Sequence, residues 1–185
     1  MTKHIDYIAF GAGVQSTAVL IACALGEPGF PKAEVALFAD TQDEPAYVMR
    51  HIEACRAWLA VWSSPLRIEV CTAGRLQDAV FQGGASPPLF LRNPDGSGGM
   101  LNRQCTERHK IRPMRRWLRS QGATSALGIM GISLDEAHRM RDSDVKWISN
   151  AYPLVDQRWD RGRCIQYVTK HLGYEPKKSA CTFCP

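Results

Sequence analysis

Residues 5–25 read IDYIAF, then GAGVQST, then AVLIACAL. The first piece has the pattern of an apolar strand, the second is a loop of small residues, and the third is an apolar helix that ends at Gly26. Such a loop lets the backbone approach an anion closely, and the start of the helix offers unpaired N–H groups. The loop lacks the Gly-Lys-Ser/Thr of a P-loop, and it lacks the third glycine of the dinucleotide-binding fingerprint. We expect a phosphate-binding loop and a buried helix, with an ordinary strand-to-helix turn as the alternative.

Composition limits the class of protein. The sequence has 185 residues, which suits one domain over residues 1–185, with a cysteine-containing C-terminal segment at residues 160–185. The net charge of +5 is compatible with anionic partners such as nucleotides or nucleic acid. No apolar run reaches the roughly 18 residues of a membrane span. Residues 1–6 show no signal peptide, so we expect a cytoplasmic protein with no membrane partner.

The elements after the first helix alternate between strand and helix. Apolar strand patterns occupy residues 34–39, 66–70 and 126–132, and a helical pattern with Asp43 as N-cap runs from there to Leu59. This alternation predicts an α/β fold with a parallel sheet and helices on both faces. Ligands of such sheets lie at the carboxyl ends of the strands. Asp40 ends the second strand there, where it would face a ribose or base, or would serve only as a turn carboxylate.

Three later segments carry further predictions. Residues 83–99 are rich in glycine and proline and read as a long mobile loop. A basic helix is expected from near Pro113, and a late helix is expected over residues 161–172, capped by Gly173. Residues 147–150 are a candidate edge strand.

Four cysteines form the candidate metal site. Cys181 and Cys184 have the Cys-x-x-Cys spacing that brings two thiolates to one metal ion. Cys105 lies among basic residues and Cys164 lies on the late helix, so the four thiolates would suit an iron–sulfur cluster or a zinc ion. Two alternatives stay open: a redox pair of Cys181 and Cys184 alone, and Cys164 packed in the core. Nearby cationic side chains are expected to lower the pKa of the thiols.

Basic residues are concentrated between residues 103 and 119. They could hold phosphates of a nucleotide or of a nucleic acid, whereas a solvated helix face is the simpler interpretation for the distal arginines. Arg103 and Lys110 flank Cys105 and are expected near the sheet edge, so they are the stronger ligand candidates.

The ordered set of motifs resembles the adenine-nucleotide alpha-hydrolase superfamily, and most closely its branch of phosphoadenosine-phosphosulfate (PAPS) reductase-like proteins. The loop at residues 11–17 resembles the pyrophosphate loop (PP-loop), Ser-Gly-Gly-x-Asp-Ser. The further matching segments are FADT at 38–41 with Glu44, RQCT at 103–106 with KIRP at 110–113, GISLDEAHR at 131–139, YPL at 152–154 and SACTFCP at 179–185. Together they cover nearly the whole chain, which makes the set more specific than any one motif.

The resemblance implies a Rossmann-like three-layer sandwich whose parallel sheet has about five strands. It implies ATP or a related adenine nucleotide as the cofactor, with Mg²⁺ and a 4Fe–4S cluster as further candidates and zinc as the alternative to the cluster. The nucleotide ligands would be Gly11, Ala12, Gly13, Gln15, Ser16, Thr17, Asp40, Gly131 and Arg139. The catalytic residues would be Cys105, Arg103 and Lys110, and the metal ligands Cys105, Cys164, Cys181 and Cys184.

Many relatives in this superfamily cleave ATP between the alpha and beta phosphates, adenylate a substrate and then deliver sulfur. Some modify DNA or transfer RNA, so a nucleic acid and a sulfur-donor protein are candidate partners. Two further hypotheses are a PAPS or adenylylsulfate reductase-like oxidoreductase that uses Cys105, and a non-catalytic subunit that binds nucleotide or nucleic acid.

The sequence departs from the superfamily pattern at several positions. Gln15 replaces the loop aspartate and Gly11 replaces the leading serine, which weakens the case for ATP cleavage. Ser133 stands where an arginine is common. The Glu-Cys-Gly-x-His tail of PAPS reductases is absent, which argues against sulfonucleotide reduction. The sequence stops directly after its cysteine pair, which suggests that a C-terminal part is missing.

Overall fold

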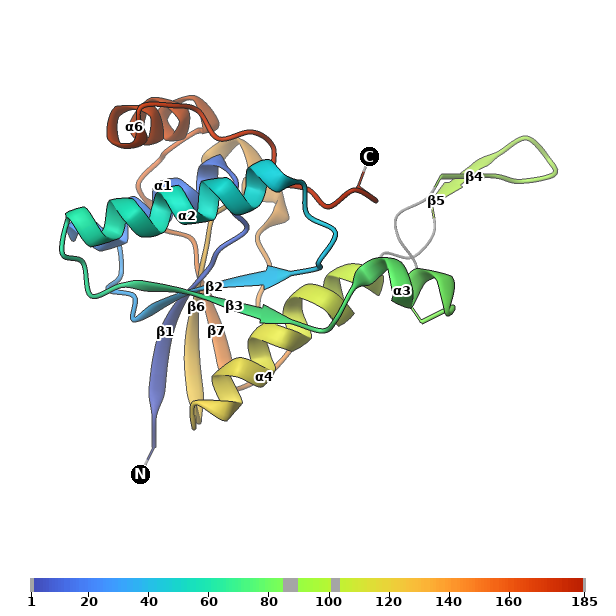
Figure 1. Ribbon diagram of the computed structural model, residues 1–185, viewed down its shortest axis with the longest axis horizontal. Helices are drawn as coiled ribbons and strands as arrows, with labels where there is room; N and C mark the ends of the chain where they lie inside the picture. Colours follow the sequence, from blue (N-terminus) through green and yellow to red (C-terminus); the bar gives the residue numbers. More distant parts are fainter. Residues whose placement is uncertain (1, 85–89, 101–103, 185) are drawn as a thin grey trace.

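A parallel five-stranded sheet organises the chain (Figure 1). The structure is a computed structural model that describes residues 2–84, 90–100 and 104–184. The sheet order is β3-β2-β1-β6-β7, and all four pairings are parallel. Its strands are β1 His4–Ala9, β2 Val35–Asp40, β3 Arg67–Thr72, β6 Ser125–Met130 and β7 Ile148–Ala151. The α/β fold class and the edge strand near residue 148 are therefore confirmed.

Helices cover both faces of the sheet and complete three layers. Three long helices lie together over one face, and α4 lies under the other (Figure 1). The first group is α1 Val14–Leu25, α2 Ala46–Val61 and α6 Arg161–Leu172; α4 is Arg112–Ser120. Two shorter helices are α3 Leu76–Phe81 and α5 Pro153–Asp156. In the part of the chain that the structure describes, no helix combines the length and apolarity that crossing a membrane requires.

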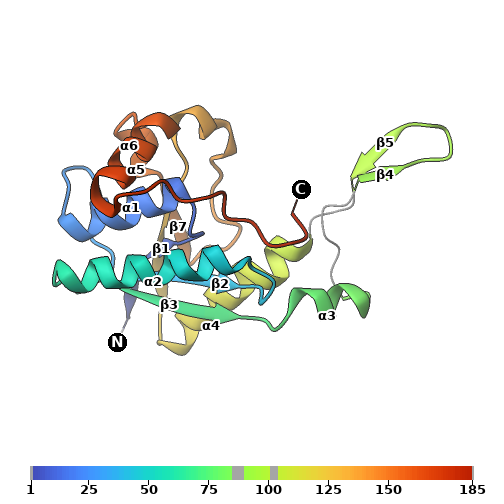
Figure 2. The same cartoon turned by 45° about the horizontal axis from the view of Figure 1, so that its top comes forward.

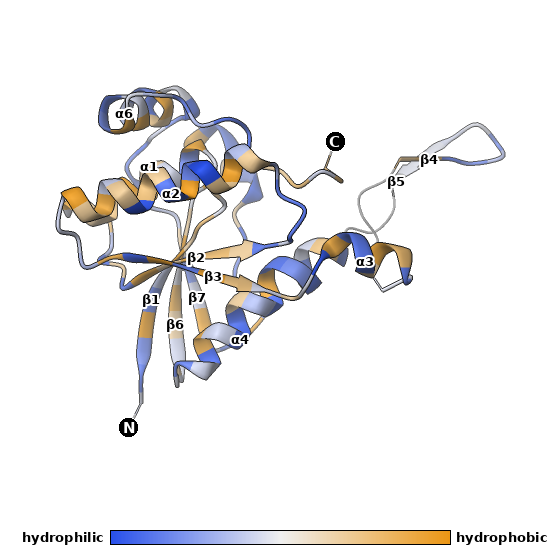
Figure 3. Ribbon diagram, in the orientation of Figure 1, coloured by the Kyte–Doolittle hydropathy of each residue, from blue (hydrophilic) through white to orange (hydrophobic). Residues whose placement is uncertain are grey.

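Alternation along β1 divides the core between the two faces. Ile8 packs with α1, α2 and α6, whereas Ile5 and Tyr7 pack with Leu118 of α4. The helix α1 is buried almost all round, as its apolar sequence predicts, because it lies between the sheet and α6. Figure 3 shows β2 mainly in the hydrophobic colour and the loop after it in the hydrophilic colour. The polar chemistry therefore lies at the carboxyl ends of the strands.

Three local predictions need correction. The second helix begins at Ala46 rather than at Asp43, because the Asp43 carboxylate caps a different helix: its Oδ2 accepts from the Gln77 N–H of α3 at 2.7 Å. Residues 90–100 are an antiparallel hairpin rather than a loop, with β4 Phe90–Arg92 and β5 Gly98–Met100. Strands of three residues are too short to show an alternation of apolar and polar residues, so the sequence reveals only the turn residues between them. The part of the expected loop at residues 85–89 lies outside the described residues.

The basic helix also begins earlier than its proline indicates. A π-helical segment, η1 Thr106–Ile111, runs directly into α4, and Pro113 stands in the first turn of α4. Proline has no N–H to donate to a preceding carbonyl, and it stands where the π-helical hydrogen-bond pattern changes to the α-helical one. Cys105 thus lies at the start of a continuous helical segment.

Candidate functional site

The loop between β1 and α1 is held open by its own hydrogen bonds. Ala12 has a positive φ of 54°, and Gly13 is the extended N-cap of α1. The Ser16 hydroxyl accepts from the Gly13 N–H at 3.2 Å and donates to the Gly13 carbonyl at 3.1 Å. The first backbone bond of the helix joins Thr17 N to Gly13 O at 2.9 Å. The N–H groups of residues 14–16 therefore point out of the first turn, where an anion binds most favourably.

A cleft of about 590 Å³, here called the loop cleft, lies directly over these N–H groups. Six of the predicted ligands line it: Gly11, Gly13, Gln15, Ser16, Gly131 and Arg139. Four further polar side chains that were not predicted as ligands also line it: Glu136, Arg161, Lys178 and Ser179. Arg139, Arg161 and Lys178 are cationic, so the cleft combines a helix N-terminus with positive charge.

Three predicted ligands, Thr17, Asp40 and Ala12, do not line the loop cleft. The Thr17 side chain is fully buried, and its hydroxyl donates to Gly13 O at 2.8 Å and contacts His51 Nε2 at 2.9 Å. It supports the loop from below rather than facing a ligand, which corrects its expected role. Asp40 ends β2 outside the loop cleft, and its Oδ1 accepts from the Gln42 N–H at 2.7 Å, in the manner of a turn carboxylate. Ala12 is 1% exposed and contributes only its backbone conformation.

Gly131 brings β6 into contact with the start of α1. A Cβ atom placed on Gly131 would lie 2.7 Å from both the N and the Cα atoms of Ser16. Both are backbone atoms of the anion-binding turn, so neither can rotate away. The absence of a side chain at Gly131 thus fixes the distance between the strand end and the loop.

Gln15 is the centre of a polar chain across the loop cleft. Its Oε1 accepts from Arg161 Nη1 at 3.1 Å, and its Nε2 donates to Glu136 Oε2 at 3.2 Å. Glu136 in turn pairs with Arg139 at 2.8 Å. A neutral amide accepts a hydrogen bond from a cation through its oxygen and donates one to a carboxylate through its nitrogen. A carboxylate at this position could accept from the cation but could not donate to Glu136. The departure from aspartate therefore has a local physical reason.

The C-terminal segment covers one side of the loop cleft. Figure 2 shows it leaving α6 and running over the layer of α1 and α2 toward the start of the basic helix. The Ser179 hydroxyl donates to the Gly11 carbonyl, the Tyr47 hydroxyl donates to Lys178 O at 3.0 Å, and Thr182 N donates to Asp43 O at 3.0 Å. These bonds hold Lys178 and Ser179 against the loop.

The cysteines divide between two places. Cys105 and Cys181 pack with Leu76 in one small apolar cluster, and Cys184 is exposed beyond a turn that Cys184 N closes to Cys181 O at 3.0 Å. Cys164 lies in the main core with 0% exposure, and burial raises the pKa of its thiol to about 12. Cys164 is therefore corrected from metal ligand to core residue, which was the alternative left open.

The remaining cysteines do not form a complete metal site. Among the described residues, no group of three or more histidine, cysteine, aspartate or glutamate side chains is arranged to hold a metal ion. Burial raises the pKa of the Cys181 thiol, although Lys110 opposes this, so the expected lowering of the thiol pKa is wrong for Cys181. The four-cysteine set thus does not fit an iron–sulfur cluster in this structure.

A buried carboxyl group lies between the cysteines and β2. Glu44 Oε1 accepts from the Thr41 hydroxyl at 3.1 Å, while its buried Oε2 has no hydrogen-bond partner among the described residues. Burial raises the pKa of Glu44, and Lys110 opposes the rise. Lys110 therefore acts electrostatically on both Glu44 and Cys181, which places this predicted catalytic residue at a polar centre. Arg103, the third predicted catalytic residue, lies outside the described residues.

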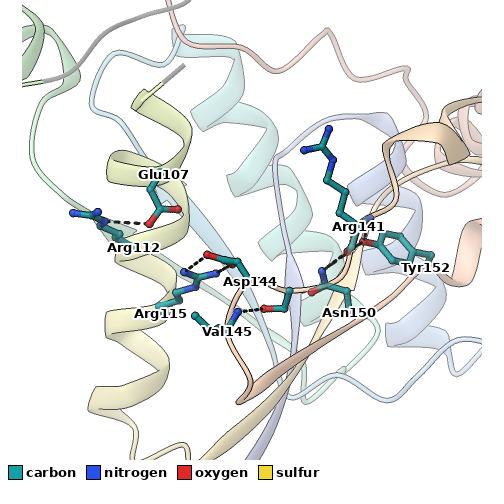
Figure 4. A network of polar contacts seen from close by, with 9 residues as sticks. Glu107, Arg112, Arg115, Arg141, Asp144, Val145, Asn150 and Tyr152 are labelled. Atoms are coloured by element: carbon teal, nitrogen blue, oxygen red, sulfur yellow. Dashed lines mark hydrogen bonds and ion pairs between the residues drawn. The ribbon is translucent and has the colours of Figure 1, made fainter. Parts of the chain in front are cut away.

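A second cleft of about 420 Å³, here called the side cleft, adjoins the loop cleft and shares Ala9 and Arg139 with it. Its outer wall is the segment 139–145, which polar bonds tie to the sheet edge (Figure 4). Asn150 Nδ2 donates to Arg141 O at 2.9 Å, and Arg115 Nη1 donates to Asp144 Oδ2 at 3.3 Å. Arg115 thus reaches the side cleft from α4.

His51 makes the stability of this region sensitive to acid. It is 6% exposed, and burial lowers its pKa from 6.5 to about 4. The folded state therefore keeps the imidazole neutral, while the unfolded chain binds a proton below pH 6.5. We expect the free energy of unfolding to fall by about 2 kcal/mol between pH 6.5 and pH 4 from this group, after a discount for solvent screening.

Urea unfolding at several pH values, with wild type and His51→Gln side by side, tests this expectation. The variant should lose that part of the acid dependence, whereas the control variant His4→Gln, at an exposed histidine, should keep it. Identical pH profiles for wild type and His51→Gln would contradict it.

Comparison with known proteins places this geometry among solved structures. No protein-family model and no curated protein matches the sequence. The crystal structure of a PAPS reductase from Candida auris, a phosphate complex, aligns with TM-score 0.56 and 17% identity over 98% of this chain and 82% of that chain. The U34-tRNA thiolase NcsA from Methanococcus maripaludis, with its [4Fe-4S] cluster, aligns with TM-score 0.57 and 13% identity over 98% of this chain. The present chain spans 61% of the thiolase. The chain therefore has the α/β fold of these two solved structures, which is the fold that the resemblance in its sequence predicted.

Proposed function

We propose that the chain binds ATP or a related adenine nucleotide with its phosphates in the loop cleft. The observation that carries this proposal is the convergence of the first-turn N–H groups of α1 with Arg139, Arg161 and Lys178 around one cleft. Preorganised donors and cations of this kind stabilise phosphate oxygens without reorganisation at the moment of reaction. The phosphate complex of the structurally similar PAPS reductase supports the ligand class.

The proposed reaction is attack on the alpha phosphate, which transfers the adenylyl group to a substrate and releases pyrophosphate. Arg161 and the N–H groups of α1 would hold the departing pyrophosphate. In the sulfur-transfer step that follows, sulfide attacks the adenylated carbon of the acceptor, a C–S bond forms, the C–O bond to the adenylyl group breaks and AMP leaves. Cys105, Lys110 and Arg103 remain the proposed catalytic residues for this step. A 4Fe–4S cluster is present in the tRNA thiolase, but no step here depends on one, because the cysteines described above do not fit it.

Pyrophosphate release from ATP by anaerobically purified protein tests this reaction. We expect release that rises when sulfide and a nucleic-acid acceptor are added, and we expect Cys105→Ser to block sulfur incorporation while it spares pyrophosphate release. ATP binding without release under any of these conditions would contradict the reaction and assign the chain to the class of non-catalytic binding subunits.

A reductase-type function is the second candidate, because Cys105 and Cys181 pack in one cluster and could form a redox pair. It predicts that the protein produces sulfite from PAPS or adenylylsulfate with a thiol reductant. Sulfite production that is unchanged by Cys105→Ser would remove Cys105 from that role.

Gln15 offers a test of charge in the loop cleft. Replacing it by glutamate would place a second carboxylate beside Glu136 and a negative charge next to the bound phosphates. We expect Gln15→Glu to weaken ATP binding by about tenfold, which corresponds to roughly 1.4 kcal/mol. Calorimetric titration measures the change, and Gln166→Glu on the exposed face of α6 is the matched control. Equal affinities for the two variants would contradict the proposed position of the phosphates.

A further inference from the structure

A second basic site lies away from the loop cleft. Four arginines of η1 and α4 line a groove of about 660 Å³ opposite Ala73 and Ala79, together with His109. We call it the arginine groove; its members are Arg108, Arg112, Arg115, Arg116 and His109. The groove lies on the α4 side of the sheet, whereas α1, α2 and α6 cover the other side.

The arginines are only partly neutralised by their neighbours. Arg112 pairs with Glu107 at 3.1 Å, and Arg115 pairs with Asp144. Arg108 donates to the Gly84 carbonyl, and no ion pair compensates its charge among the residues that the structure describes. Arg116 is exposed and has no hydrogen-bond or ion-pair partner in the ranges that the structure describes. Two of the four charges thus remain available to an anion.

His109 provides an independent sign of a ligand in the groove. The residue is 5% exposed, and its Nδ1 atom is buried without a hydrogen-bond partner among the described residues. Buried polar atoms are rarely left unpaired, because each one costs free energy. His109 lines the groove, so a phosphate bound there would lie next to this imidazole.

The spread of the arginines along the helical segment favours a polymer over a small anion. Arg108 and Arg116 are eight residues apart, which corresponds to roughly 12 Å along the helix axis. Arginines spread over this distance can contact successive phosphates of one nucleic-acid strand, whereas a small anion meets only the arginines that converge on it. Arg115 also lines the side cleft, which shares Arg139 with the loop cleft. A strand in the groove would therefore pass beside the proposed site of adenylation.

We propose that the arginine groove binds the phosphate backbone of a nucleic-acid strand and so positions an acceptor beside the loop cleft. As an account of the acceptor, this proposal rests on the proposed function. Binding of the strand to the arginine groove is tested in the absence of ATP. The groove proposal and the proposed ATP-dependent function can therefore fail separately.

The test is fluorescence anisotropy with a labelled 12-nucleotide single-stranded RNA and the DNA of the same sequence, at several salt concentrations. We expect the double variant Arg108→Ala/Arg116→Ala, which removes the two available charges, to bind at least about tenfold more weakly than wild type. The slope of log affinity against log salt should fall by about 0.7 for each lost phosphate contact. The control Arg50→Ala/Lys170→Ala removes the same charge from the other face and should change little. Binding that the groove variant leaves unchanged would overturn the proposal.

Three further measurements separate the alternatives. The His109 imidazole nitrogen signals should shift when the RNA is added; unchanged signals at saturation would overturn the proposal. Inorganic pyrophosphate should compete weakly with the RNA, and displacement of the RNA at micromolar pyrophosphate would assign the groove to a small anion instead. ATP binding by the groove variant should equal that of wild type, which keeps this test separate from the proposed function.

Discussion

Gly131→Ala is expected to weaken ATP binding by roughly 10- to 100-fold, because displaced N–H groups lose charge-assisted hydrogen bonds to phosphate, which contribute about 1.5–3 kcal/mol. The added methyl group would lie 2.7 Å from the backbone N and Cα of Ser16, so the strand end or the loop must move. That movement separates the first-turn N–H groups from Arg139 and Arg161, which line the same cleft. We also expect the free energy of unfolding to fall by about 1–3 kcal/mol through overpacking.

Equilibrium binding of a fluorescent ATP analogue, followed with urea unfolding of the same samples, measures both effects. Gly98→Ala is the matched control, because a Cβ at Gly98 meets no atom within 4 Å. If Gly131→Ala binds ATP as wild type does, the loop cleft is not the phosphate site.

Arg161→Ala is the second variant with a large expected effect. A charged hydrogen bond to a phosphate contributes about 1.5–3 kcal/mol, so its loss should weaken ATP binding by roughly 10- to 100-fold. The backbone of the helix start should be unaffected, because Arg161 N donates to Asp135 Oδ1 at 2.9 Å and the Asp160 side chain caps Arg163 N at 2.7 Å. Stability should therefore change by less than about 0.5 kcal/mol.

Calorimetric titration with ATP distinguishes the loss of a specific phosphate contact from the general effect of removing one positive charge. Lys170→Ala removes one cation from the far end of the same helix and should leave the affinity within about twofold of wild type. Arg161→Lys should restore part of the affinity, since it keeps the charge but not the planar guanidinium. An Arg161→Ala variant with the affinity of Lys170→Ala would contradict the proposed contact.

Much of the fold could be predicted because local patterns and global packing agree. The apolar strand at residues 5–10 and the apolar helix after it can be buried only inside a layered sheet, and the structure places them there. The position of the loop at the carboxyl edge follows from the parallel topology, so Gly11, Gly13 and Ser16 could be named in advance. Gly131 was also named, although its steric reason is visible only in three dimensions.

The parts that could not be predicted depend on contacts between distant segments. Arg161 is separated from Gln15 by 146 positions, so the bond between them leaves no local pattern. Asp43 reads as the cap of the helix that follows it, yet it caps α3 across a loop. Cys164 matches both a core position and a thiolate ligand in sequence, and only the packing of α6 against α1 decides between them.

The most direct test of the central claim is a titration of ¹⁵N-labelled protein with ATP, followed by the backbone amide signals. We predict that the largest shifts occur at the N–H groups of residues 14–16, with smaller shifts at Gly131 and at the start of α6. Saturable ATP binding that leaves residues 14–16 unchanged and shifts other surfaces instead would contradict the assignment of the loop cleft as the phosphate site.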